Sequence, residues 1–117
     1  MNYLSVMEMK ESIKTKLVEF LSLCKSHNVK NIYAFGSAVS ENFDDETSDI
    51  DLLIEIDSED PIIRGENLMS IWDKFEDFFQ KKVDLLTNSS IKNPILRKSI
   101  DNTKILIYDG KEQKISF

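Results

Sequence analysis

The stretch GSAVSENFDDETSDIDLLIEI, from Gly36 to Ile56, decides the fold because its last eight residues have the pattern of a core strand. Strict alternation places Ile50, Leu52, Ile54 and Ile56 on one face. The other face carries Asp49, Asp51, Leu53 and Glu55. A buried strand that begins with two carboxylates one residue apart is unusual, and these two residues are therefore candidates for a functional site.

The flanking sequence predicts alternating helices and strands. Strands are expected at 29–35, 49–56, 83–87 and 104–108, with helices at 8–28, 37–42, from Asp60 onwards and from Pro94 to Asp101. Asp109-Gly110 is a tight-turn signal, after which residues 111–117 could return as a hairpin partner. The order predicts a small α/β or α+β domain over residues 1–117. Its mixed sheet has about four to five strands with flanking helices.

The composition narrows the classes of function. The 117 residues include 21 acidic and 15 basic ones, so the net charge of -6 argues against binding a long nucleic acid. No apolar run is long enough to cross a membrane, and no signal peptide is visible. Cys24, the only cysteine, suits a reducing cytoplasm and is expected as a small buried side chain. His27 is expected to be exposed at a helix end.

Three carboxylates are candidate metal ligands. Acidic pairs spaced like Asp49 and Asp51 occur four times, about what chance gives, so their placement on a strand rather than their number is informative. Their side chains start roughly 6–7 Å apart. Asp84 enters a separate strand in the same way, and if the strands are neighbours the three acids meet. Such oxygen ligands suit Mg²⁺ or Mn²⁺, whereas the alternative is a set of solvated strand ends.

A candidate phosphate site precedes the acids. At Gly36-Ser37 a strand ends and a short helix begins, so backbone amides and a hydroxyl could hold an anion. The alternative is a plain turn and helix cap, and Ser48 is likewise expected at a turn or cap. A phosphate held beside a metal ion would serve phosphoryl or nucleotidyl transfer.

Together these residues resemble the nucleotidyltransferase superfamily that includes DNA polymerase β. Its motif corresponds to Gly36-Ser37, Ser48-Asp49-Ile50-Asp51-Leu52 and the later strand with Asp84. The small size resembles the minimal nucleotidyltransferase branch. The resemblance implies Asp49, Asp51 and Asp84 as catalytic metal ligands, with Gly36, Ser37 and Ser48 at the nucleotide. It also implies Mg²⁺ or Mn²⁺, ATP or another nucleoside triphosphate, and a HEPN-domain toxin as partner, which some antitoxins of this branch modify with AMP on a tyrosine.

The loop after Gly36-Ser37 departs from the family pattern. It reads Ala38, Val39, Ser40, Glu41 and has neither the arginine nor the second glycine that often occur there. Cations that could replace the arginine are Lys81, Lys82, Arg97 and Lys98. Two hypotheses therefore remain. One is an enzyme that transfers AMP to a protein hydroxyl, and the other is a catalytically weak or inactive binding module that neutralises its partner by complex formation.

Overall fold

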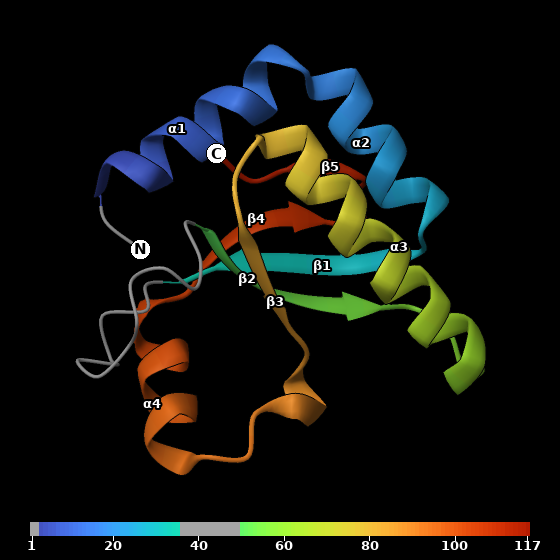
Figure 1. The fold of residues 1–117 in the computed structure, drawn as a ribbon, viewed down its shortest axis with the longest axis vertical. Coiled ribbons are helices and arrows are strands. Elements are labelled where there is room, and N and C mark those ends of the chain that lie inside the picture. Colours follow the sequence, from blue (N-terminus) through green and yellow to red (C-terminus); the bar gives the residue numbers. More distant parts are fainter. Residues whose placement is uncertain (1–2, 36–49) are drawn as a thin grey trace.

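The computed structural model describes residues 3–35 and 50–117. Over this part the chain forms a five-stranded sheet in the order β3-β2-β1-β4-β5, flanked by helices (Figure 1). The helices are α1 (Tyr3–Thr15), α2 (Leu17–Ser26), α3 (Pro61–Phe79) and α4 (Pro94–Thr103), with a short 3₁₀ turn η2 (Asn88–Ser90). The strands are β1 (Val29–Ala34), β2 (Ile50–Ile56), β3 (Val83–Leu86), β4 (Ile105–Asp109) and β5 (Lys114–Ile115).

The sheet is mixed, as the sequence predicts. Strand β1 pairs antiparallel with β2 and β4, β4 pairs antiparallel with β5, and β2 pairs parallel with β3. The predicted return of the tail is confirmed by β5. Parallel neighbours need a crossover, and α3 supplies it. Asp60 caps this helix by accepting a hydrogen bond of 2.9 Å from the Ile62 amide, and Pro61 fills the first position, as expected from the sequence.

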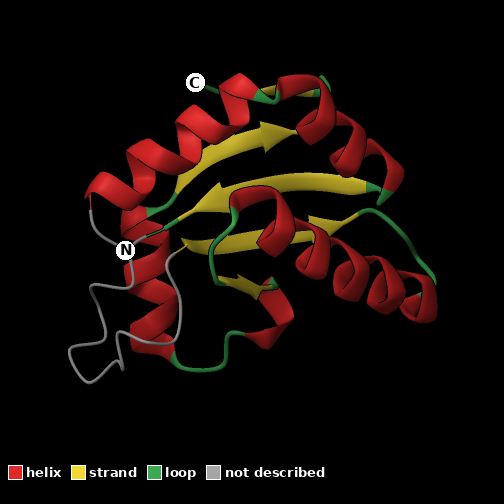
Figure 2. Ribbon diagram, turned by 45° about the horizontal axis from the view of Figure 1, so that its top comes forward, coloured by secondary structure: helices red, strands yellow, loops and turns green. Residues whose placement is uncertain are grey.

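The two faces of the sheet carry separate apolar clusters. The larger one joins the Ile50, Leu52, Ile54 and Ile56 face of β2 to α1, α2 and α3. The smaller one contains Phe35, Leu53, Ile91 and Ile100, with Leu96 of α4 packed against it. Figure 2 shows α4 separate from the three helices on the larger cluster. The face that carries Asp51 is therefore partly covered, and the predicted alternation along β2 is confirmed.

The helix predicted for residues 8–28 is two helices with a break at Lys16. The backbone of Lys16 lies outside the helical region at φ -119° and ψ 46°. Its Nζ donates a hydrogen bond of 2.7 Å to the carbonyl of Phe78 in the last turn of α3 and lies 4.2 Å from the centre of that ring. A cation is favourable at the carbonyl end of a helix, so a tertiary contact accompanies the bend.

The prediction that His27 is exposed is wrong. The side chain is buried between α2 and α3, with 7% of its surface exposed. Its Nδ1 lies 2.7 Å from the Leu23 carbonyl, which can only accept, so Nδ1 carries a hydrogen; Nε2 lies 2.9 Å from the Ser70 hydroxyl. These bonds satisfy the buried ring and tie the end of α2 to α3.

Within the described residues, no helix is both long enough and apolar enough to cross a membrane.

Candidate active site

Strand pairing brings two of the three candidate carboxylates together. Asp51 of β2 and Asp84 of β3 are register partners in the parallel pair. Partner residues of neighbouring strands lie about 4.8 Å apart and project from the same face. This face also carries Leu53 and Leu86 of the smaller apolar cluster. The condition that the two acidic strands be neighbours is therefore met.

Burial and mutual repulsion shape the electrostatics of this pair. The side chain of Asp51 is buried, with 1% of its surface exposed, and Asp84 is half-buried. Burial raises the pKa of the Asp84 carboxyl above its usual value of 3.8, and the charge of Asp51 raises this pKa further. Two close, partly desolvated carboxylates disfavour the doubly ionised state. Such a pair gains from a cation between its oxygens.

The end of β1 lies beside the same acids. Ala34 is the register partner of Leu52, and the Phe35 amide donates a hydrogen bond of 3.2 Å to the carbonyl of Asp51. The described chain therefore stops at Phe35 next to Asp51 and resumes at Ile50. The candidate residues Gly36, Ser37, Ser48 and Asp49 lie outside the described residues, as does the helix predicted at 37–42. The described part holds no group of three potential metal ligands.

The four candidate cations occupy different surroundings. Lys81 forms an ion pair of 3.0 Å with Glu8, and Lys98 is exposed on α4. Lys82 precedes β3, and its carbonyl accepts the Ile50 amide at 3.2 Å. Two-residue periodicity places Lys82 on the same face as Asp84. Of the four cations, Lys82 is the one whose position in the chain, two residues before Asp84, places it on this face.

The fourth cation, Arg97, holds the loop that follows β3. Its Nη1 and Nη2 donate to the side-chain and main-chain oxygens of Asn88 at 2.8 and 2.7 Å. The Asn88 amide in turn donates to Glu55 at 3.4 Å. These contacts link α4 to β2 across the smaller apolar cluster. Nothing in the sequence pattern singled out Asn88, because an asparagine in a polar loop looks like any turn residue.

The chain belongs to the polymerase beta nucleotidyltransferase family, whose model matches residues 15–113. It is a nucleotidyltransferase by this membership. Two similar proteins of Methanocaldococcus jannaschii are provisionally named protein adenylyltransferases. MJ0126 is 36% identical over 100 residues, covering 86% of this chain and 95% of the relative. MJ1217 is 38% identical over 85 residues, covering 73% of this chain and 83% of the relative.

Solved structures with a similar chain course include a tri-AMPylated Shewanella oneidensis HEPN toxin in complex with its MNT antitoxin. The alignment has 18% identity and a TM-score of 0.46 and covers 88% of this chain and 75% of that chain. A toxin–antitoxin structure with AMP-PNP aligns at 21% identity and a TM-score of 0.47, over 80% and 74% of the two chains. The family assignment depends on the sequence matches alone.

Proposed function

We propose that this chain transfers AMP from ATP to a tyrosine hydroxyl of a HEPN-domain partner and so acts as the antitoxin of that partner. Family membership and the names of the sequence relatives support nucleotidyl transfer to a protein. The HEPN partner is carried over from the family resemblance. The single observation that carries the proposal is the register pairing of Asp51 with Asp84 on one face of the sheet.

The paired acids fit a divalent metal ion. Asp51 and Asp84 are adjacent oxygen donors, and the pKa of Asp84 is raised by burial and then by the charge of Asp51, both of which a cation would offset. Carboxylate oxygens are the ligands that Mg²⁺ and Mn²⁺ prefer. We assign both residues, with Asp49, as the metal ligands. When bound, the ion supplies Lewis-acid activation of the attacking oxygen and charge neutralisation at the phosphates.

The proposed reaction is a substitution at the α-phosphorus of ATP. The tyrosine oxygen forms a bond to this phosphorus, the bond to the bridging oxygen of the β-phosphate breaks, and pyrophosphate leaves with that electron pair. The hydroxyl proton passes to a carboxylate, and we propose Asp84 for this role because it is half-buried beside Asp51 on the same face of the sheet. Gly36, Ser37 and Ser48 are proposed to hold the phosphates, with Lys82 as the nearby positive charge.

Composition supports a protein acceptor in a reducing compartment. The net charge of -6 disfavours a long nucleic acid as substrate. The buried, lone Cys24 suits the cytoplasm, which we propose as the location.

The test uses ATP labelled in its α-phosphate, Mg²⁺ and the protein encoded beside this chain, which we propose is the HEPN-domain partner. Label should move to the partner with wild-type protein and with the control Asp101→Asn, an exposed substitution on α4. It should fall at least a hundredfold with Asp51→Asn or Asp84→Asn, since each removes a charge that the transition state needs. Full labelling by both site variants would overturn the assignment. If the wild type does not label the partner and an Asp49→Asn/Asp51→Asn double variant still binds it tightly, the hypothesis of an inactive binding module is the one that remains.

A further inference from the structure

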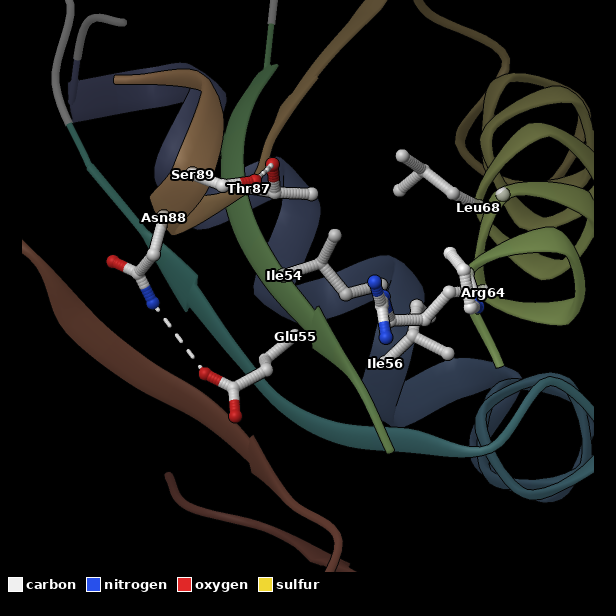
Figure 3. Close-up of a pocket in the computed structure, with 10 residues that line it drawn as sticks. Ile54, Glu55, Ile56, Arg64, Leu68, Thr87, Asn88 and Ser89 are labelled. Atoms are coloured by element: carbon white, nitrogen blue, oxygen red, sulfur yellow. Dashed lines mark hydrogen bonds between the residues drawn. The ribbon is translucent and has the colours of Figure 1, made fainter. Parts of the chain in front are cut away.

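A cavity lies towards the opposite end of β2 from the paired acids. Its volume is about 430 Å³, within the range of small-molecule sites. It is lined by residues of β2, of the first turns of α3 and of the loop after β3: Ile54, Glu55, Ile56, Pro61, Arg64, Gly65, Leu68, Thr87, Asn88 and Ser89 (Figure 3). Ile54, the lining residue of β2 nearest to Asp51, lies three residues farther along the strand, roughly 10 Å away, and faces the other side of the sheet. The cavity is therefore separate from the candidate active site.

The topology of the chain favours ligand binding at this place. Strands β2 and β3 run parallel and are joined by α3, and the cavity lies at their carboxyl ends beside the amino end of the crossover helix. Ligands of open α/β sheets bind at such strand ends. The last residue of β2 that pairs with β3 is Leu53, whereas β2 continues for three more residues to Ile56. The cavity occupies the side of β2 that β3 no longer covers.

Gly65 keeps the wall of the cavity open. It is the fifth residue of α3, and a Cβ at this position would meet no atom within 4 Å. Its φ is not positive either, so neither backbone geometry nor packing requires glycine. Glycine inside a helix costs about 1 kcal/mol relative to alanine. Gly65 lines the cavity, so a large side chain at this position would enter the open space beside it.

Arg64 supplies a positive charge at the cavity. Its Nη1 donates to the carbonyls of Ser58 at 2.8 Å and Glu59 at 3.4 Å, and these are the only hydrogen bonds of its side chain to the described residues. The hydrogens on Nε and Nη2 remain available for a ligand. Figure 3 shows Arg64 extending from α3 toward Ile54 and Ile56 of β2. An arginine fork with open donors matches a carboxylate or a phosphate.

The carboxylate that lines the cavity does not compete for Arg64. Glu55 pairs with Lys30 at 3.3 Å and accepts a hydrogen bond from Asn88, and Figure 3 shows it directed toward Asn88 and away from Arg64. The hydroxyls of Thr87 and Ser89, 3.2 Å apart, add polar groups on the opposite wall. The apolar surface comes from β2 and Leu68.

We propose that this cavity binds a small molecule that has an apolar body and one oxyanion, either a carboxylate or a phosphate monoester. The apolar body packs on Ile54, Ile56 and Leu68, and the oxyanion accepts hydrogen bonds from Arg64. The site is independent of nucleotidyl transfer, so either proposal can fail without the other.

The probes are hexanoate and hexyl phosphate, with hexylamine and hexan-1-ol as comparators of equal chain length. Binding is measured by titration of the amide resonances of ¹⁵N-labelled full-length protein. Both oxyanions, or one of them, should shift the amides of residues 54–56, 64–68 and 87–89 with dissociation constants on the order of millimolar, as expected for so few atoms. A response to one oxyanion alone identifies the head group. Equal or tighter binding of hexylamine, or no shift with either oxyanion at tens of millimolar, would overturn the proposal.

Matched variants separate the two features of the site. Arg64→Gln should weaken binding about tenfold or more, the value of a charge-assisted hydrogen bond, whereas Lys74→Gln on the same helix should not. Gly65→Phe should abolish binding by filling the cavity, and Gly65→Ala should keep it. Thermal unfolding checks that each variant folds. If Gly65→Phe does not fold, Arg64→Gln alone tests the proposal. Unchanged affinity in Arg64→Gln would also contradict the proposal.

Discussion

Asp51 and Asp84 are register partners in adjacent parallel strands, and this pairing places one buried and one half-buried carboxylate on the same face of the sheet. A domain that needed only stability would gain by replacing either residue, because like charges at this separation repel in a partly desolvated setting. The arrangement therefore trades stability for a site that can hold a cation. The repulsion between these two carboxylates should lower the free energy of unfolding of the metal-free protein by a measurable amount.

We expect Asp84→Asn to stabilise the metal-free protein at neutral pH. Because the pKa of Asp84 is raised in the folded state, the unfolded chain loses its proton first as the pH rises through 3.8. As the pH rises above 3.8, the free energy of unfolding falls until the pH exceeds the pKa of Asp84 in the folded protein. Above that pH the charged Asp84 destabilises the protein by its full amount. After solvent screening the gain in Asp84→Asn should be about 1 kcal/mol, or about 4 °C in Tm.

The measurement is thermal unfolding in EDTA at several pH values, with Asp101→Asn as the surface control. The advantage of Asp84→Asn should shrink as the pH falls through the folded-state pKa and disappear well below 3.8, where Asp84 is protonated in both the folded and the unfolded wild type. Added Mn²⁺ should raise the Tm of the wild type and have little effect on Asp84→Asn, as ligand linkage requires. An advantage of Asp84→Asn that grew on acidification would contradict the assigned cause.

Gly110→Ala should destabilise the protein because of crowding at the turn between β4 and β5. A Cβ there would lie 2.4 Å from the carbonyl oxygen of Val29 and 2.6 Å from that of Lys30. The backbone must shift to admit it, and the Gly110 amide bond to Lys30 at 2.8 Å would be disturbed. We expect a loss of about 1–3 kcal/mol by chemical denaturation. Gly65→Ala is the matched control and should gain about 0.5–1 kcal/mol, since its Cβ meets open space.

Lys16→Met should weaken the contact between the bend of the amino-terminal helices and α3. The substitution keeps an apolar stem but loses the hydrogen bond to the Phe78 carbonyl and the charge over its ring. The expected loss is about 1–2 kcal/mol by urea denaturation, because the bond is charge-assisted and part-buried. Lys25→Met, on the exposed side of α2, should change stability by less than about 0.5 kcal/mol. Equal effects of both would mean that the Phe78 contact contributes nothing specific.

Cys24 should resist thiol reagents in the native state. Its side chain is fully buried in the larger apolar cluster, and burial raises the pKa of the thiol far above its usual value. Only the thiolate reacts, so modification must wait for local or global opening. Labelling with a maleimide should be slow in buffer and fast in denaturant. Rapid labelling of folded protein would show that the α2 packing opens readily.

Local sequence patterns were sufficient for the strand β2, the cap Asp60-Pro61, the returning tail and the choice of Asp51 and Asp84 as candidates. Each of these depends on neighbours in the chain, through two-residue alternation, side-chain capping or turn chemistry. Only the tertiary structure decided that α4 and Asn88 cover the acidic face, that the amino-terminal helix bends at Lys16, and that His27 is buried. Those outcomes depend on contacts between residues far apart in sequence, whose energies no local pattern contains.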